Sequence, residues 1–200
     1  SSIQNRYAVI MAGGKGERFW PLSTSKHPKQ LLNLFGQKTM IEMTVDYLLG
    51  IVDLRYILVI TTQHLRHAIQ QLLTKLPSGN IIAEPIGRNT APACAFASAI
   101  IGTRNPNAVF CTITSDHLIG DIKTFQQRMR QAFNYAATSD LLVTFGIKPT
   151  RPHTGYGYIE VGSCFDKKNG FFVVKRFVEK PNYKTAVMYF TKKRFYWNSG

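Results

Sequence analysis

Short apolar runs alternate with longer, helix-like segments along the first three quarters of the chain. We expect buried strands at 7–11, 56–61, 80–83, 108–113 and 141–146. We expect helices at 39–52, 64–76, 90–102 and 125–137. This alternation is typical of parallel strands joined by helices that cover both faces of the sheet. The pattern therefore predicts an α/β fold with a mostly parallel sheet.

The pattern changes after residue 148. Pro149 and Pro152 interrupt it, and two longer strand-like runs at 156–161 and 171–178 flank a turn rich in Asp, Asn and Gly. Two such runs around a turn predict an antiparallel extension. We expect one catalytic domain over 1–200, with a first half at 1–148 and a second half at 149–200.

A glycine-rich segment follows the first expected strand. It begins Ala12-Gly13-Gly14-Lys15-Gly16-Glu17-Arg18 and extends to Pro28-Lys29-Gln30. Glycine permits positive φ angles and has no Cβ, so backbone N–H groups can approach an anion closely. The segment matches neither the dinucleotide fingerprint nor the P-loop, and Pro21 argues against a helix at the glycines. It predicts a triphosphate-binding loop, with a turn that binds nothing as the alternative.

Two further polar groups follow expected strands, where ligands bind in parallel sheets. Residues 84–93 pass from a strand into a helix start, which favours anions and polar bases, although a plain capped helix would look the same. Asp116 follows the clearest strand, at 108–113. A carboxylate placed among phosphates is a natural Mg²⁺ ligand, although Asp is also a common turn residue.

Another polar group lies in the second half. It comprises residues 155–159, Glu179 and Lys180, and the segment at 197–200. Glycines within a strand allow close backbone approach, as a sugar ring would require. Carboxylate, ammonium and amide groups could then bind hydroxyls or a sugar phosphate. Each of these signals is weak when taken singly.

Charge and cysteine content narrow the partners. The chain has 25 Lys and Arg against 11 Asp and Glu, a formal net charge of +14, which attracts polyanions. The basic residues are scattered, so we expect phosphorylated small molecules as partners and not nucleic acid. A third interpretation of the charge is that an acidic remainder of the protein is missing from this chain. Three widely spaced cysteines suggest reduced thiols in the cytoplasm. The sequence has no apolar membrane span and no signal-peptide core, so we expect no membrane partner.

Taken in order, these motifs closely resemble those of the bacterial mannose-1-phosphate guanylyltransferases, the GDP-mannose pyrophosphorylases of the sugar nucleotidyltransferase superfamily. The resemblance extends from residue 7 to residue 200. Thr114 stands where the family usually has Pro, and Phe19 where Leu is common. The chain stops at Gly200 where the family continues, so the resemblance implies an N-terminal catalytic portion without a second metal-binding Asp.

The resemblance implies a Rossmann-like, glycosyltransferase-A-type, three-layer fold. It also implies transfer of GMP from GTP to α-D-mannose 1-phosphate with Mg²⁺ as cofactor, as a step of GDP-mannose and polysaccharide biosynthesis. It assigns catalysis to Arg18 and Lys29, and the metal to Asp116. It assigns nucleotide binding to Ala12, Gly13, Gly14, Gly16, Glu84, Arg88, Asn89 and Thr90. It assigns sugar-phosphate binding to Gly157, Glu179, Lys180 and Asn198.

Other functions remain open from the sequence. The chain could be another sugar-1-phosphate nucleotidyltransferase with a different base or hexose. It could also be a regulatory paralogue that binds nucleotide sugars without catalysis. A homodimer is compatible with the sequence.

Overall fold

The computed structural model describes residues 5–14, 31–33, 36–85 and 90–199. Contacts divide the chain into two compact units between Asp140 and Leu141, before the expected division after residue 148. The first unit holds β1 (Arg6–Met11), α1 (Met40–Leu48), η4 (Leu54–Tyr56), β2 (Ile57–Thr62), α2 (Gln63–Leu72), η5 (Ser78–Asn80), β3 (Ile81–Glu84), α3 (Thr90–Arg104), β4 (Val109–Thr114) and α4 (Ile122–Thr138). The second holds β5 (Gly146–Ile147), β6 (Tyr158–Asp166), β7 (Phe171–Val178), α5 (Tyr183–Thr191) and β8 (Phe195–Asn198).

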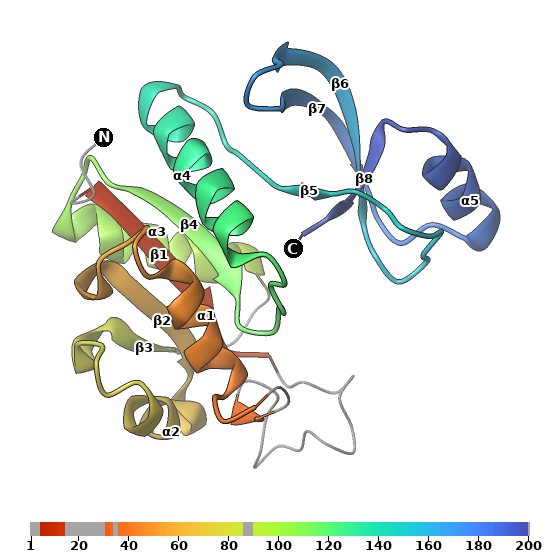
Figure 1. The fold of residues 1–200 in the computed structure, drawn as a ribbon. Helices are drawn as coiled ribbons and strands as arrows, with labels where there is room; N and C mark the ends of the chain where they lie inside the picture. The colour runs from red at the N-terminus through yellow and green to blue at the C-terminus, as the bar shows by residue number, and fades with distance from the viewer. Residues whose placement is uncertain (1–4, 15–30, 34–35, 86–89, 200) are drawn as a thin grey trace. The chain divides into compact units, whose positions relative to one another are not determined.

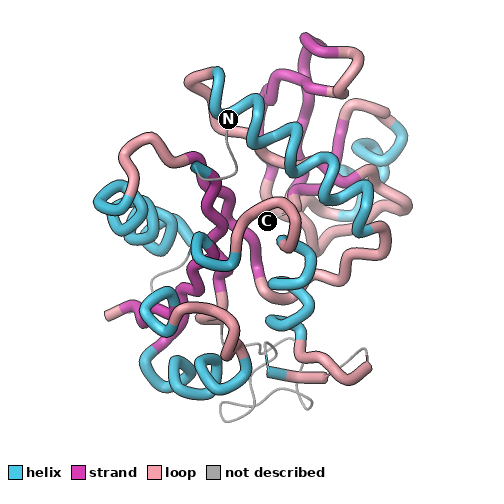
Figure 2. Tube along the Cα trace, turned by 60° about the vertical axis from the view of Figure 1, so that its left-hand side comes forward, coloured by secondary structure: helices cyan, strands magenta, loops and turns pink. Residues whose placement is uncertain are grey.

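The first unit is a parallel sheet covered by helices on both faces. Its strands lie in the order β3-β2-β1-β4, and every neighbouring pair is parallel. Helices α1 and α4 lie against one face and α3 lies against the other (Figures 1 and 2). The α/β fold with a parallel sheet, as expected from the sequence, is confirmed.

Alternating side chains of the central strands divide the core between the two faces. Tyr7 and Val9 of β1 join Leu58 and Ile60 of β2 in a cluster with three residues of α3, which are Ala93, Ala97 and Ile101. The alanines let the α3 backbone approach the sheet closely. The other face takes Ala8 and Ile10, which are fully buried. At the start of β1, Arg6 donates to Asn134 Oδ1 of α4 at 2.9 Å.

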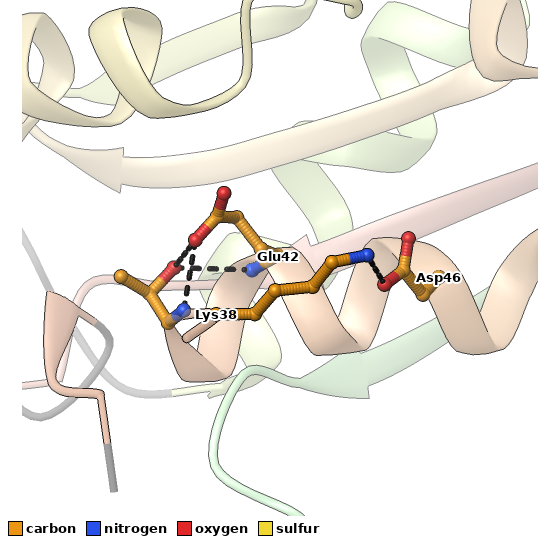
Figure 3. A network of polar contacts seen from close by, with 4 residues as sticks. Lys38, Glu42 and Asp46 are labelled. Carbon is orange, nitrogen blue, oxygen red and sulfur yellow. Dashed lines mark hydrogen bonds and ion pairs between the residues drawn. The ribbon is translucent and has the colours of Figure 1, made fainter. Parts of the chain in front are cut away.

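Helix α1 begins at a capping box. Thr39 Oγ1 accepts from the Glu42 amide at 3.4 Å, and Glu42 Oε2 accepts from the Thr39 amide at 2.8 Å. Lys38 Nζ reaches along the helix to Asp46 Oδ2 at 2.5 Å (Figure 3). The expected helix at 39–52 ends earlier, at Leu48. Gly50 has a φ of 79°, in the left-handed region that follows many helix ends.

Helix α4 has 17 residues and one buried stripe. Asp121 caps it by accepting from the Thr124 amide at 2.9 Å, and Met129 and Phe133 are its buried residues. Its other positions are mostly polar, as befits a helix that covers a sheet. None of the helices in the described ranges combines the length and apolarity needed to cross a bilayer.

The second unit is an antiparallel sheet with one helix. Its strands lie in the order β5-β8-β6-β7. The expected antiparallel extension is therefore confirmed, with β7 at the expected bounds and β6 longer than expected. Tyr158 of β6, Tyr189 of α5 and Phe195 of β8 form its core, and the last two rings stack at 4.0 Å.

The expected strand at 141–146 is wrong. Only Gly146 and Ile147 are in a strand, and they pair with β8 instead of extending the parallel sheet. Leu141 and Leu142 are exposed, at 55% and 103%. A short apolar run does not by itself distinguish a buried strand from a connecting segment. Here the segment enters the second unit, because its pairing partner is β8.

Candidate functional site

The strand order places two of the predicted motifs next to each other. On one side of β1 the sheet continues with β2 and then β3, and on the other side it continues with β4. Ligands of such sheets bind beyond the carboxyl ends of the strands, where the order reverses. Ser115 joins the two ends there, because its amide and its Oγ both donate to Met11 O, at 3.3 and 3.1 Å. The start of the glycine segment and Asp116 are thus at the switch point.

Asp116 lies just past the end of β4, with 23% of its side chain exposed. Its neighbour His117 places Nε2 at 3.9 Å from Asp116 Oδ1 and 3.2 Å from Thr114 Oγ1. Among the described residues, no three His, Cys, Asp or Glu side chains gather into a metal-binding group. One carboxylate without a protein cage fits Mg²⁺, which usually takes one or two carboxylates and completes its shell with phosphates and water.

Glu84 faces the first residues of the glycine segment. Ala12 is held on both sides, since its amide donates to Ile60 O at 2.8 Å and its carbonyl accepts from Thr61 Oγ1 at 3.0 Å. A Cβ on Gly13 would lie 3.6 Å from Glu84 Oε2. Burial raises the pKa of Glu84 above its ordinary value. Gly13 therefore brings the backbone close to a partly desolvated carboxylate.

The remaining nucleotide-binding predictions divide between described and undescribed residues. Gly14 continues the loop from Gly13, and Thr90 begins α3 and is exposed. The other predicted residues, including both catalytic ones, lie outside the described residues: Gly16, Arg18, Lys29, Arg88 and Asn89. Their roles stay predictions.

In the second unit, three of the four predicted sugar-phosphate residues come together. A Cβ on Gly157 would lie 3.6 Å from Glu179 Oε2 and 3.7 Å from Asn198 Cβ. The Asn198 amide also donates to Gly157 O at 2.8 Å. The fourth residue, Lys180, forms an ion pair with Glu179, and both side chains are more than half exposed. The group thus offers a carboxylate, an ammonium and an amide around a glycine.

Sequence reasoning missed the aromatic group beside this glycine. His153 stacks on Tyr156 with ring centroids 4.1 Å apart and an interplanar angle of 13°. Trp197 presents an edge-to-face contact to Tyr156 at 5.1 Å and to His153 at 6.2 Å. The only signal in the sequence was a histidine two residues before the Gly155-Tyr156-Gly157 run.

Sequence reasoning also missed a buried carboxylate in β6. Glu160 is 2% exposed, and Arg176, its cross-strand partner, places Nε 2.6 Å from Glu160 Oε2. Arg194 and Lys175 lie at 3.2 and 3.8 Å from the other oxygen. The hydrogen bond from Arg176 is the main reason that the pKa of Glu160 lies below its ordinary value. The sequence gives no signal for this burial, because a Glu within a strand is usually exposed to solvent.

Comparison with known proteins places the chain in a family. The nucleotidyl transferase family model matches residues 7–200. The chain belongs to the nucleotidyl transferase family. This nucleotidyl transferase chain resembles a mannose-1-phosphate guanylyltransferase of Klebsiella pneumoniae, with 42% identity over 195 residues that cover 96% of the chain and 41% of the relative. A mannose-1-phosphate guanylyltransferase of Escherichia coli K12 is 43% identical over 200 residues, covering 97% and 41%.

Two solved structures show the same fold as this nucleotidyl transferase chain. A Thermus thermophilus protein named as a mannose-1-phosphate geranyltransferase gives a TM-score of 0.85 at 33% identity, over 98% of this chain and 56% of that one. A mannose-6-phosphate isomerase of Helicobacter pylori gives 0.75 at 25% identity, over 97% and 68%. The chain spans about two fifths of the length of the curated relatives it matches.

Proposed function

We propose that the full protein transfers GMP from GTP to α-D-mannose 1-phosphate and releases pyrophosphate. The observation that carries the proposal is that Gly13, Glu84 and Asp116 all lie at the carboxyl ends of parallel strands, with Gly13 beside Glu84 and with Ser115, next to Asp116, bonded to Met11. Such an edge suits a nucleotide, with an open backbone for phosphates and a carboxylate for a divalent cation. Relatives named as mannose-1-phosphate guanylyltransferases support the choice of GTP and mannose.

The chemistry needs no general base from the protein. An oxygen of the sugar phosphate is already ionised, and it attacks the α-phosphorus of GTP while the bond to the bridging oxygen of pyrophosphate breaks. Positioning and charge neutralisation then supply the rate enhancement. We assign neutralisation of the charge on the leaving pyrophosphate to Arg18 and Lys29, which belong to the glycine segment.

Glu84 is our candidate for base recognition. Guanine presents two donors on one edge, the N1–H and the N2 amino group, and a carboxylate accepts from both. The partial burial of Glu84 strengthens such contacts, because water competes less for its oxygens. Thr90 at the start of α3 and the residues before it complete the proposed nucleotide contacts.

Asp116 would hold Mg²⁺, which when bound supplies positive charge to the triphosphate. This chain's own part is to place the carboxylate at the switch point, through the two hydrogen bonds from Ser115 to Met11. In the second unit, Gly157, Glu179, Lys180 and Asn198 would bind the sugar phosphate. The free thiols of Cys94, Cys111 and Cys164 fit the reducing cytoplasm, where we place the reaction.

The test is pyrophosphate release by the full-length protein with a panel of nucleoside triphosphates and sugar 1-phosphates. We expect the highest kcat/KM with GTP, mannose 1-phosphate and Mg²⁺. Lys29→Ala should lower kcat by orders of magnitude, because a charge aimed at the transition state is worth about 3 kcal/mol or more. Asp116→Ala should abolish Mg²⁺-dependent turnover.

The same panel separates the alternatives. A preference for another base or hexose would assign the protein to a different sugar nucleotidyltransferase activity. Tight binding of GTP or GDP-mannose without turnover would indicate a regulatory paralogue. Wild-type turnover in Lys29→Ala would remove that residue from the proposed site.

A further inference from the structure

We propose that His153 is a positioning residue for the sugar-phosphate group of Gly157, Glu179 and Asn198. This role rests on the proposed function and deepens it, since it concerns how the second substrate is held. His153 touches none of those three residues in the contacts described above. Its influence passes through Gly155 and Tyr156, which precede Gly157 in the chain, and through Trp197 on β8.

The backbone of His153 is anchored in the core of the second unit. Tyr158 is fully buried, and its hydroxyl accepts from the His153 amide at 3.1 Å and donates to the His153 carbonyl at 2.9 Å. The Tyr158 ring packs on Tyr189 of α5. The position of the His153 backbone is therefore independent of its own side chain.

The side chain of His153 shapes the turn that follows. Its Nδ1 accepts from the Gly155 amide at 2.9 Å, which closes the turn. The ring packs so tightly on Gly155 that a Cβ there would lie 2.9 Å from His153 Cε1. The other large contact of the ring is the stack on Tyr156. The hydrogen bond and the stack together fix residues 155 and 156.

Gly157 comes next in the chain, and it has little freedom of its own. Its carbonyl accepts from the Asn198 amide at 2.8 Å, and a Cβ at its position would meet Glu179 Oε2 at 3.6 Å. Trp197, the residue before Asn198, meets the rings of both His153 and Tyr156. One histidine thus connects the segment that holds Gly157, just before β6, with β8, which holds Asn198.

Two substitutions separate the two contacts of the His153 ring. Asn can accept from an amide two residues ahead, so His153→Asn keeps the turn and removes the stack. His153→Phe keeps an aromatic ring and removes the acceptor. His153→Ala removes both. Thr154→Ala, an exposed position in the same turn, serves as the matched control.

The experiment measures KM for mannose 1-phosphate and for GTP in the full-length protein and these variants. We expect His153→Ala to raise KM for mannose 1-phosphate about tenfold, and the Asn and Phe variants about threefold each. KM for GTP should stay within about twofold of wild type, since the residue belongs to the second unit. His153→Ala should also lower the melting temperature by a few degrees, since it removes a hydrogen bond and a ring stack, so the unchanged KM for GTP is the readout that separates positioning from general loosening.

Some outcomes would overturn the role of His153 while the proposed function stands. One is a wild-type KM for mannose 1-phosphate in His153→Ala when the unsubstituted protein makes GDP-mannose. Another is an equal rise in both KM values, which would indicate general loosening. By contrast, no turnover of any sugar 1-phosphate by the unsubstituted protein would overturn the proposed function, and the role of His153 with it.

Discussion

Ser115 ties the end of β4 to the end of β1, with its amide and its hydroxyl both donating to the carbonyl oxygen of Met11. The double contact sets the distance between the residue before the glycine segment and the residue before Asp116. A carbonyl has two lone pairs, so one oxygen can satisfy both donors. The candidate metal ligand is therefore held close to the start of the segment that we predict to bind phosphate.

Ser115→Ala should weaken this link without breaking it, because the hydrogen bond from the backbone amide of residue 115 to Met11 O remains. We expect a loss of about 1 kcal/mol in the free energy of unfolding and a severalfold rise in the Mg²⁺ concentration for half-maximal activity. Urea unfolding and Mg²⁺ titration of pyrophosphate release measure the two effects. Thr114→Val, which removes a hydroxyl near His117 instead, is the control. An unchanged Mg²⁺ requirement in Ser115→Ala would contradict the positioning of Asp116 by this bond.

Gly13→Ala should spare the fold and harm nucleotide binding. The new Cβ fits at 3.6 Å from Glu84, an ordinary contact, so we expect a change below about 0.5 kcal/mol in unfolding free energy. The same Cβ would hinder the close approach of a nucleotide to the backbone, so KM for GTP should rise about tenfold. Gly102→Ala in α3 is the matched control, since nothing lies near its added Cβ. It should stabilise the helix by up to about 1 kcal/mol with unchanged KM.

Glu84→Gln should preserve or raise the stability of the fold while it weakens the preference for guanine. Burial raises the pKa of Glu84, so its ionised form costs stability above the unfolded-state pKa. The neutral variant should thus be as stable as wild type or more stable at pH 7, and any gain should vanish below about pH 4. Its amide clashes with one guanine donor, so the preference for GTP over ATP should fall about tenfold or more. An unchanged GTP:ATP ratio of kcat/KM would place base recognition elsewhere.

Glu160→Gln tests the buried carboxylate of the second unit. Because Arg176 lowers the pKa of Glu160, the ionised group stabilises the fold above its unfolded-state pKa, and that contribution disappears as pH falls through the folded value. The variant should be less stable than wild type at pH 7, with the difference shrinking below about pH 4. Urea unfolding at several pH values measures this. Glu179→Gln, at an exposed carboxylate in the same unit, should lose far less.

The sequence predicted the parallel sheet well because its strands are short apolar runs that end at glycine or polar residues. It missed α5 and β8, although Asn182 caps α5 by accepting from the Thr185 amide at 2.9 Å. Strand β8 has only four residues, and it exists through its pairing with β6 and β5. The error at 141–146 has the same origin, since a strand is defined by a partner that local pattern does not specify.

In the candidate site, too, some features could be predicted from the sequence and others could not. The proximity of Gly13 and Asp116 was predictable, because parallel strands bring their carboxyl ends to one edge. The burial of Glu160 was not, because it depends on the register between strands of the second unit. The stack of His153 on Tyr156 was not predictable either, because it depends on the conformation of the turn between them. Sequence spacing along one strand contains no information about which residue lies opposite.

The candidate site residues lie apart from the packed core of the first unit, and this separation matters for protein engineering. Gly13, Glu84 and Asp116 stand at or beyond the last paired residues of their strands, whereas the packed interior lies between β1, β2 and α3. Substitutions at Gly13, Glu84 or Asp116 should therefore leave the packed interior in place. A protein engineer can use this separation to vary the proposed base-recognising Glu84 in a library while the core sequence is kept.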